Sequence, residues 1–149
     1  MGYSVDLSAH PLQSRLRSLT RGCEYVGEVG RSWLLLLLID LHVWSDGINA
    51  IQRKVERQRA STVMESPTWS SVELCHALDL ACVFYFKRVR CLQHSAALTL
   101  LLRRHGWNAE MVMGAQILPA SFHAWTQIGD TVVNDGPDVV GRYRVWTRW

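Results

Sequence analysis

The sequence predicts an α+β fold, in which a helical N-terminal half precedes one prominent helix and a small antiparallel sheet. Apolar residues recur at helical spacing through residues 10–87, and a strongly helical stretch covers residues 91–104. Segments of alternating apolar and polar residues follow that stretch. The 149 residues have the length of one domain, so we predict a single domain over 1–149 with subregions 1–87 and 88–149.

The composition is that of a globular protein. Apolar residues make up 48% of the chain and charged residues 19%, which argues against disorder. The net charge of +3 is mild and does not indicate a nucleic-acid partner. The first 30 residues carry charges and no apolar run, so they do not resemble a secretory signal. We therefore expect a cytoplasmic protein with reduced thiols.

The first helical segments are separated by glycines and by one turn. Gly22, Gly27 and Gly30 interrupt the early helical pattern. The apolar run from Trp33 to Ile39 is shorter than the roughly 20 residues that cross a membrane, so we expect a buried helix there. An exposed face that docks a partner protein or a membrane surface is the alternative. Residues 45–47 predict a turn before the next helix.

A polar loop over residues 61–68 leads to a helix with a clear start. Ser70 is followed three residues later by Glu73, the spacing of a capping box. Cys75 and Cys82 fall on the apolar stripe of this helix, and we expect them to be small core residues.

The second half combines one helix with a meander. The helix over 91–104 ends with arginines in its last turn and a glycine just after it. Strands are predicted over 107–115, 122–128 and 131–134, with a tight Gly-Asp turn between the last two. Residues 139–149 form either a last strand or a tail.

Cys91 is the cysteine best placed to act as a nucleophile. It opens the predicted helix, where the helix dipole and free backbone N–H groups favour a thiolate. Arg88 and Arg90 act in the same direction. The backbone N–H of Cys91 is also a candidate donor to an oxyanion, whereas Gln93 is a poor second donor.

His123 and Asp135 complete a candidate catalytic set. They are twelve residues apart on strands joined by the Gly-Asp turn, so a hairpin places them side by side. Asp135 then orients one ring nitrogen of His123 while the other faces Cys91. This order of cysteine, histidine and acid is similar to that of papain-like and transglutaminase-like enzymes.

Two other interpretations of these residues remain open. Cys91, His94 and His123 are possible zinc ligands, but no second ligand pair supports them, so we expect no metal. Cys91, His123 and Asp135 are also compatible with a core cysteine, a hydrogen-bonded strand histidine and a turn aspartate.

Five segments carry a resemblance to a known family: residues 91–98, 101–106, 112–114, 122–125 and 133–135. They resemble the leader peptidase of lasso peptide biosynthesis, the transglutaminase-like protease half of the B protein. The resemblance implies a papain- or transglutaminase-like fold, with a nucleophile-bearing helix packed on a small antiparallel sheet.

The resemblance also implies roles for individual residues. Cys91 is the nucleophile, His123 the general base and Asp135 the orienting acid of a cysteine peptidase. Phe122 stands where the family commonly has a small residue, and Thr126 replaces a valine. Phe122 and Trp125 are candidates for contact with the substrate peptide.

The implied function is removal of the leader from a ribosomally made precursor peptide. A separate leader-recognition protein and an ATP-dependent macrolactam synthetase are the implied partners, with ATP belonging to the synthetase and no cofactor in this chain. The alternatives are a transglutaminase-like acyl transferase with another substrate, and a scaffold without catalysis that docks the synthetase through the helix from Trp33 to Ile39.

Overall fold

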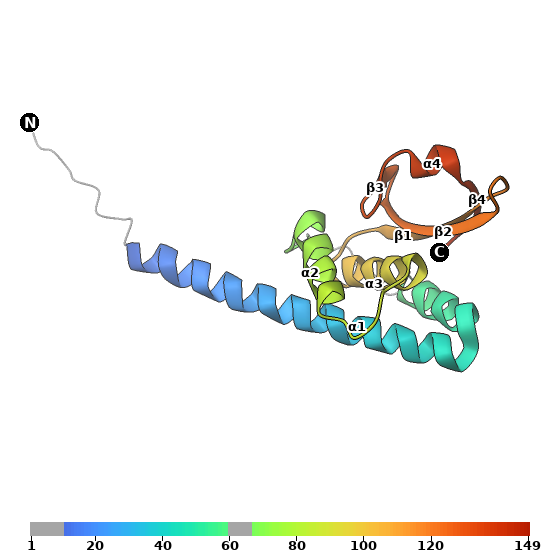
Figure 1. Ribbon diagram of the computed structural model, residues 1–149. Helices are drawn as coiled ribbons and strands as arrows, with labels where there is room; N and C mark the ends of the chain where they lie inside the picture. The colour runs from blue at the N-terminus through green and yellow to red at the C-terminus, as the bar shows by residue number, and fades with distance from the viewer. Residues whose placement is uncertain (1–10, 60–66) are drawn as a thin grey trace, which may run out of the picture.

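A computed structural model describes residues 11–59 and 67–149 and confirms the α+β class. Three helices come first, α1 (Pro11–Arg59), α2 (Ser71–Val83) and α3 (Cys91–Arg104), and α3 has the predicted bounds. Helix α3 lies between α1 and the sheet, so it contacts both halves of the molecule (Figure 1). Gly106, with a φ of 86°, ends this helix as predicted.

Helix α1 differs from the prediction in where it bends. It continues through the positions of Gly22, Gly27 and Gly30, so the expected interruption there is wrong. No atom lies within 4 Å of a Cβ built at these glycines, so they cost the helix only about 1 kcal/mol of propensity each. The bend occurs at Asp46 and at Gly47, whose φ is 60°, within the predicted turn.

The run from Trp33 to Ile39 has both a buried and an exposed side. Leu36 and Ile39 are buried in the core, whereas Leu34 and Leu38 are exposed. Part of α1, within Thr20–Gln58, is long and apolar enough to cross a membrane by length and composition, and 22% of that window is buried. Core helices of soluble proteins meet the same criterion, so this is weak evidence for a membrane span. The cytoplasmic location stays a prediction.

Helix α2 begins with the predicted capping box. The backbone N–H of Glu73 donates to Ser70 Oγ at 3.2 Å, and the Ser70 N–H donates to the Glu73 carboxylate at 3.0 Å. Cys75 and Cys82 are half-buried and pack against the main core, in agreement with the expected role. The predicted loop before α2 lies outside the described residues as far as residue 66.

The sheet is antiparallel with the strand order β3-β2-β1-β4. The predicted meander is confirmed as β1 (Ala109–Gln116), β2 (Ser121–Ile128) and β3 (Thr131–Val132). The last segment is more than a strand, because α4 (Val139–Arg142) precedes β4 (Arg144–Arg148). Strand β4 pairs with β1 rather than β3, so α4 carries the chain from one edge of the sheet to the other (Figure 1).

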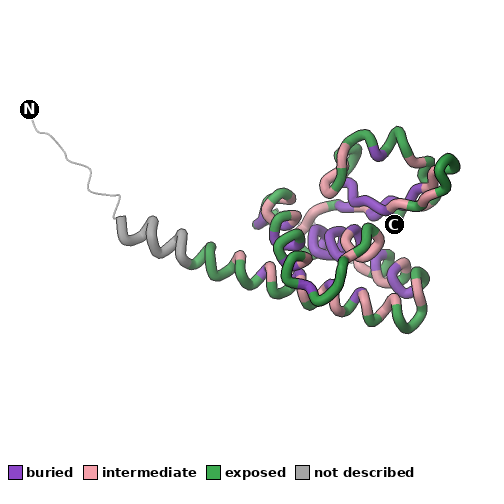
Figure 2. The backbone as a smooth tube through the Cα atoms, in the orientation of Figure 1, coloured by how far each residue is buried: buried purple, intermediate pink, exposed green. Residues whose placement is uncertain are grey.

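Both faces of the sheet are covered, and most buried residues gather around α3 and the adjacent strands (Figure 2). Trp125 packs with Val112 and Val139 in a second, smaller cluster. Arg103 is buried and donates to the carbonyls of Val55, Ala109 and Trp149 at 2.5–2.7 Å. One guanidinium therefore links α1, the sheet and the last residue.

Candidate active site

Cys91 is the first residue of α3, and its side chain is exposed. The helix starts here because Gln93 Oε1 accepts the Arg90 backbone N–H at 3.0 Å. The Gln93 amide also contacts Asp40, so this side chain is engaged in holding the helix start. The backbone N–H of Cys91 lies at the N-terminus of α3, beside the thiol, where it is a candidate donor to an oxyanion.

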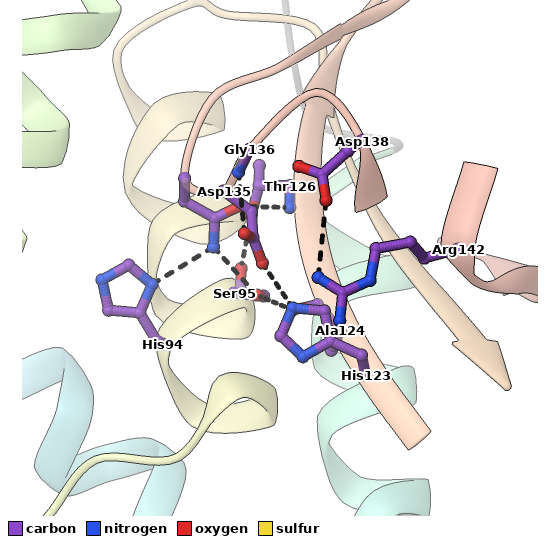
Figure 3. A network of polar contacts seen from close by, with 10 residues as sticks. His94, Ser95, His123, Ala124, Thr126, Asp135, Gly136, Asp138 and Arg142 are labelled. Carbon is purple, nitrogen blue, oxygen red and sulfur yellow. Dashed lines mark hydrogen bonds and ion pairs between the residues drawn. The ribbon is translucent and has the colours of Figure 1, made fainter. Parts of the chain in front are cut away.

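His123 and Asp135 lie side by side, as the hairpin predicted. His123 Nε2 contacts Asp135 Oδ2, and Asp135 Oδ1 accepts the Gly136 N–H at 2.7 Å (Figure 3). Burial raises the pKa of Asp135, but the hydrogen bonds from His123 and Gly136 and the nearby Arg142 charge outweigh it, so the pKa is lowered overall. Asp135 is therefore held as a carboxylate beside the imidazole.

The three predicted residues line one cavity of about 420 Å³. The cavity is open to solvent at the meeting point of the α3 N-terminus, the β2 start and the segment after β3. Because Nε2 of His123 is used by Asp135, Nδ1 is the ring nitrogen that remains for the thiol. Among the described residues, no hydrogen bond joins Cys91 to His123.

A second imidazole, that of His94, lies on the same cavity. His94 Nε2 is 2.9 Å from Asp79 Oδ1 on α2, and its Nδ1 is 3.2 Å from the Asn134 amide nitrogen. The interpretation of His94 as a zinc ligand gains no support, because the described residues contain no group of three His, Cys, Asp or Glu side chains that could hold a metal ion.

Asn134 is a residue that the sequence analysis missed. Its Oδ1 accepts the backbone N–H of Thr126 at 2.7 Å, and its Nδ2 donates to Ser95 Oγ at 3.0 Å. Ser95 Oγ in turn donates to the Ala124 carbonyl at 2.9 Å. Asn134 thus fastens the segment that carries Asp135 to both α3 and β2; its place directly before Asp135 is the only sequence signal for this role.

The two candidates for substrate contact differ in burial. Phe122 is 71% exposed, and its ring centroid lies 6.3 Å from that of Trp146, which is also exposed. Trp125 is fully buried, so the expectation that it contacts a substrate is wrong. It faces the second cluster because neighbouring residues of a strand point to opposite sides, and Thr126 takes the side toward α3.

Two arginines also line the cavity. Arg88 and Arg90 belong to the segment that leads into α3, and both are exposed. Their charges and the positive end of the helix favour negative charge at the cavity mouth. A thiol, an imidazole with a carboxylate behind it and free N–H groups are the components of acyl transfer through a thioester.

Comparison with known proteins agrees with this description. The sequence profile of the transglutaminase-like superfamily matches residues 34–148. The chain is also similar to the microcin J25-processing protein McjB of Escherichia coli, with 30% identity over 63 residues. That match covers 41% of this chain and 30% of the length of McjB. No solved structure matches the chain. The resemblance inferred from the motifs is confirmed at this level.

Proposed function

The chain belongs to the transglutaminase-like superfamily, and on this basis we propose that it is a cysteine peptidase that removes the leader from a ribosomally made lasso precursor peptide. The observation that carries the proposal is the contact between His123 and Asp135 on a cavity that also exposes Cys91 at the start of α3. The similarity to a microcin-processing protein favours a peptide substrate.

The proposed reaction is acyl transfer to water in two steps. The Cys91 thiolate attacks the carbonyl of the last leader residue, and the backbone N–H of Cys91 donates to the oxyanion. Protonated His123 gives its proton to the amine of the core peptide, which leaves as the thioester forms. Neutral His123 then takes a proton from water, which attacks the thioester and releases the leader acid and the thiolate.

Partners supply the remaining parts of the pathway in this proposal. We propose that a leader-recognition protein presents the precursor peptide to the cavity. A macrolactam synthetase that uses ATP then consumes the free core amine, and the peptidase itself needs no cofactor. Phe122, exposed beside Trp146, is the proposed contact for the peptide.

Transfer of the acyl group to an amine is the second candidate, because the superfamily is named for that chemistry. It shares the thioester with the proposed hydrolysis and differs only in the acceptor. Adding a small primary amine to the reaction distinguishes the two: a hydrolase gives mainly the free leader acid, whereas a transferase gives mainly the leader amide.

The decisive experiment follows precursor cleavage by mass spectrometry, with purified chain, precursor peptide and recognition protein. We expect the wild type to release the core peptide and Cys91→Ala to release none. Cys23→Ala is the matched control, because Cys23 is also an exposed thiol but lies on α1, outside the cavity. Cleavage by Cys91→Ala at the wild-type rate would overturn the proposal.

A further inference from the structure

The orientation of the Asn134 side chain is fixed by its neighbours. A backbone N–H can only donate, so the atom of Asn134 that faces the Thr126 N–H must be the carbonyl oxygen. The amide nitrogen therefore points the other way, toward Ser95 Oγ at 3.0 Å and His94 Nδ1 at 3.2 Å. Both of these atoms must act as acceptors.

This orientation also fixes the tautomer of His94. Since its Nδ1 accepts from Asn134, the ring proton lies on Nε2, where it donates to the Asp79 carboxylate at 2.9 Å. Both nitrogens are thus occupied, and the ring is mostly shielded, with a side-chain exposure of 20%. Although His94 lies on the cavity, it is not free to take a proton from the thiol.

Asp135 depends on its neighbour for its position. Among the described residues, its hydrogen bonds are with the Gly136 N–H and the His123 ring, and its side chain is 38% exposed. A carboxylate on an exposed segment loses entropy when it is held against one ring. Asn134, one residue earlier, makes the bonds to α3 and β2 that fix this segment of the chain.

We propose that Asn134 and His94 are a positioning pair, in which His94 holds the Asn134 amide and Asn134 holds Asp135 against His123. The proposal rests on the proposed function, because it assigns the pair a role in setting the geometry of that catalytic set. Both residues line the cavity, but the pair is assigned no part in the chemical steps. Asp79 is the outer anchor that keeps the His94 ring in the required tautomer.

A double-mutant cycle tests whether Asn134 acts through Asp135. We expect Asn134→Ala to lower kcat by about 10-fold or more with KM within about 2-fold, because alignment of the general base is lost and peptide binding is not. In an Asp135→Ala background the same change has nothing left to position, so it has no further effect on kcat. Equal and independent losses in both backgrounds would overturn the proposal.

Substitutions at His94 test the acceptor role. The side-chain oxygen of asparagine can occupy the place of Nδ1, so His94→Asn keeps an acceptor for the Asn134 amide, whereas His94→Ala removes it. We expect His94→Asn to retain kcat within about 3-fold of wild type and His94→Ala to match Asn134→Ala. Equal losses of kcat in the two His94 variants would contradict the proposed role of His94 as the acceptor for the Asn134 amide.

A matched control separates positioning from general packing. Thr99→Val removes a buried contact of 3.2 Å between Thr99 and Thr126 on the same seam of α3 and β2, but it leaves Asn134 and His94 intact. We expect wild-type kcat for this variant. A loss as large as that of Asn134→Ala would reduce the pair to ordinary structural support and contradict the proposal.

A measurement without substrate keeps this proposal distinct from the proposed function. The proton that His123 Nε2 donates to Asp135 gives an NMR resonance that Asp135→Ala abolishes. We expect Asn134→Ala to broaden or shift this resonance and Thr99→Val to leave it unchanged. Asn134→Asp, which keeps the acceptor for Thr126 but not the amide donor, should behave like Asn134→Ala. An unchanged resonance in both Asn134 variants would overturn the positioning role, whether or not the chain cleaves a precursor.

Discussion

Two histidines line one cavity, each hydrogen-bonded to an aspartate, and they differ in the second ring nitrogen. His123 donates to Asp135 from β2, and its other nitrogen has no hydrogen-bond partner among the described residues. His94 donates to Asp79 from α3, and its other nitrogen accepts from Asn134. An acid behind an imidazole therefore does not by itself define a general base; a free second ring nitrogen is also required.

The pairs also differ in how the chain brings them together. A two-strand hairpin joins His123 to Asp135, so their proximity follows from local turn geometry. His94 and Asp79 lie on successive helices, and their contact depends on how α2 packs against α3. The first pair is therefore visible in the sequence, whereas the second requires the tertiary structure.

Alanine substitutions at His123 and His94 should have very different effects on cleavage. His123→Ala should lower the rate of precursor cleavage by about 10³- to 10⁴-fold, because the proton donor and acceptor of both chemical steps is lost. His94→Ala should cost only about 10-fold, because it removes a support and not a reacting group. Single-turnover cleavage, followed by mass spectrometry, measures both; similar losses would break the comparison.

The next effect concerns the reactivity of the exposed and the partly buried thiols. Burial, and secondarily the Asp79 charge, raises the pKa of Cys75 and of Cys82 to about 11. Compared with a thiol at the usual 9.0, ionisation alone slows their alkylation about 100-fold at neutral pH. Brief treatment with iodoacetamide and peptide mapping should find the exposed Cys23 and Cys91 modified first. Early modification of Cys75 would contradict the assigned environment of α2.

A smaller effect distinguishes the two carboxylates. Asp135→Asn keeps an acceptor for His123 but removes the charge that stabilises an imidazolium, so we expect about a 10-fold lower kcat. Asp79→Asn keeps the acceptor for His94 Nε2, and Asp79 lies behind a supporting residue, so kcat should change by less than about 3-fold. The same cleavage assay compares them, and a larger loss for Asp79→Asn would reverse the assignment of roles.

The smallest effect is the pH dependence of stability. The pKa of Asp135 is lowered in the folded chain, so this carboxylate stabilises the fold at neutral pH, and the contribution is lost as the pH falls below the ordinary aspartate value of 3.8. The group is partly exposed, so the change is modest. The difference in Tm between wild type and Asp135→Asn should shrink from pH 7 to pH 3; a difference that grows in acid would contradict the sign.

The sequence predicted the parts of the site that depend on local geometry. The start of α3 at Cys91 followed from its helical pattern, and the contact of His123 with Asp135 followed from the hairpin. The burial of Trp125 was not predicted, because the side of a strand that faces solvent depends on what α4 and β4 cover. The role of Asn134 was missed because its partners are a backbone N–H, a serine and a histidine on other elements.

The same distinction between local and long-range interactions applies to the fold. The continuous course of α1 past Gly22 was missed because helix propensity is a weak local preference that packing of Leu36 and Ile39 outweighs. The pairing of β4 with β1 was missed because it joins segments far apart in the chain, and no short-range pattern encodes it.

The buried Arg103 has a consequence for how the molecule opens. Amide protons in edge strands exchange with solvent when the strand opens locally within the native state. Here the Trp149 carbonyl accepts from Arg103 and from Met111, and the Trp149 N–H donates back to Met111. Detaching residue 149 exposes a guanidinium that also holds Val55 and Ala109, so the amide proton of Trp149 should exchange as slowly as those at the centre of β1.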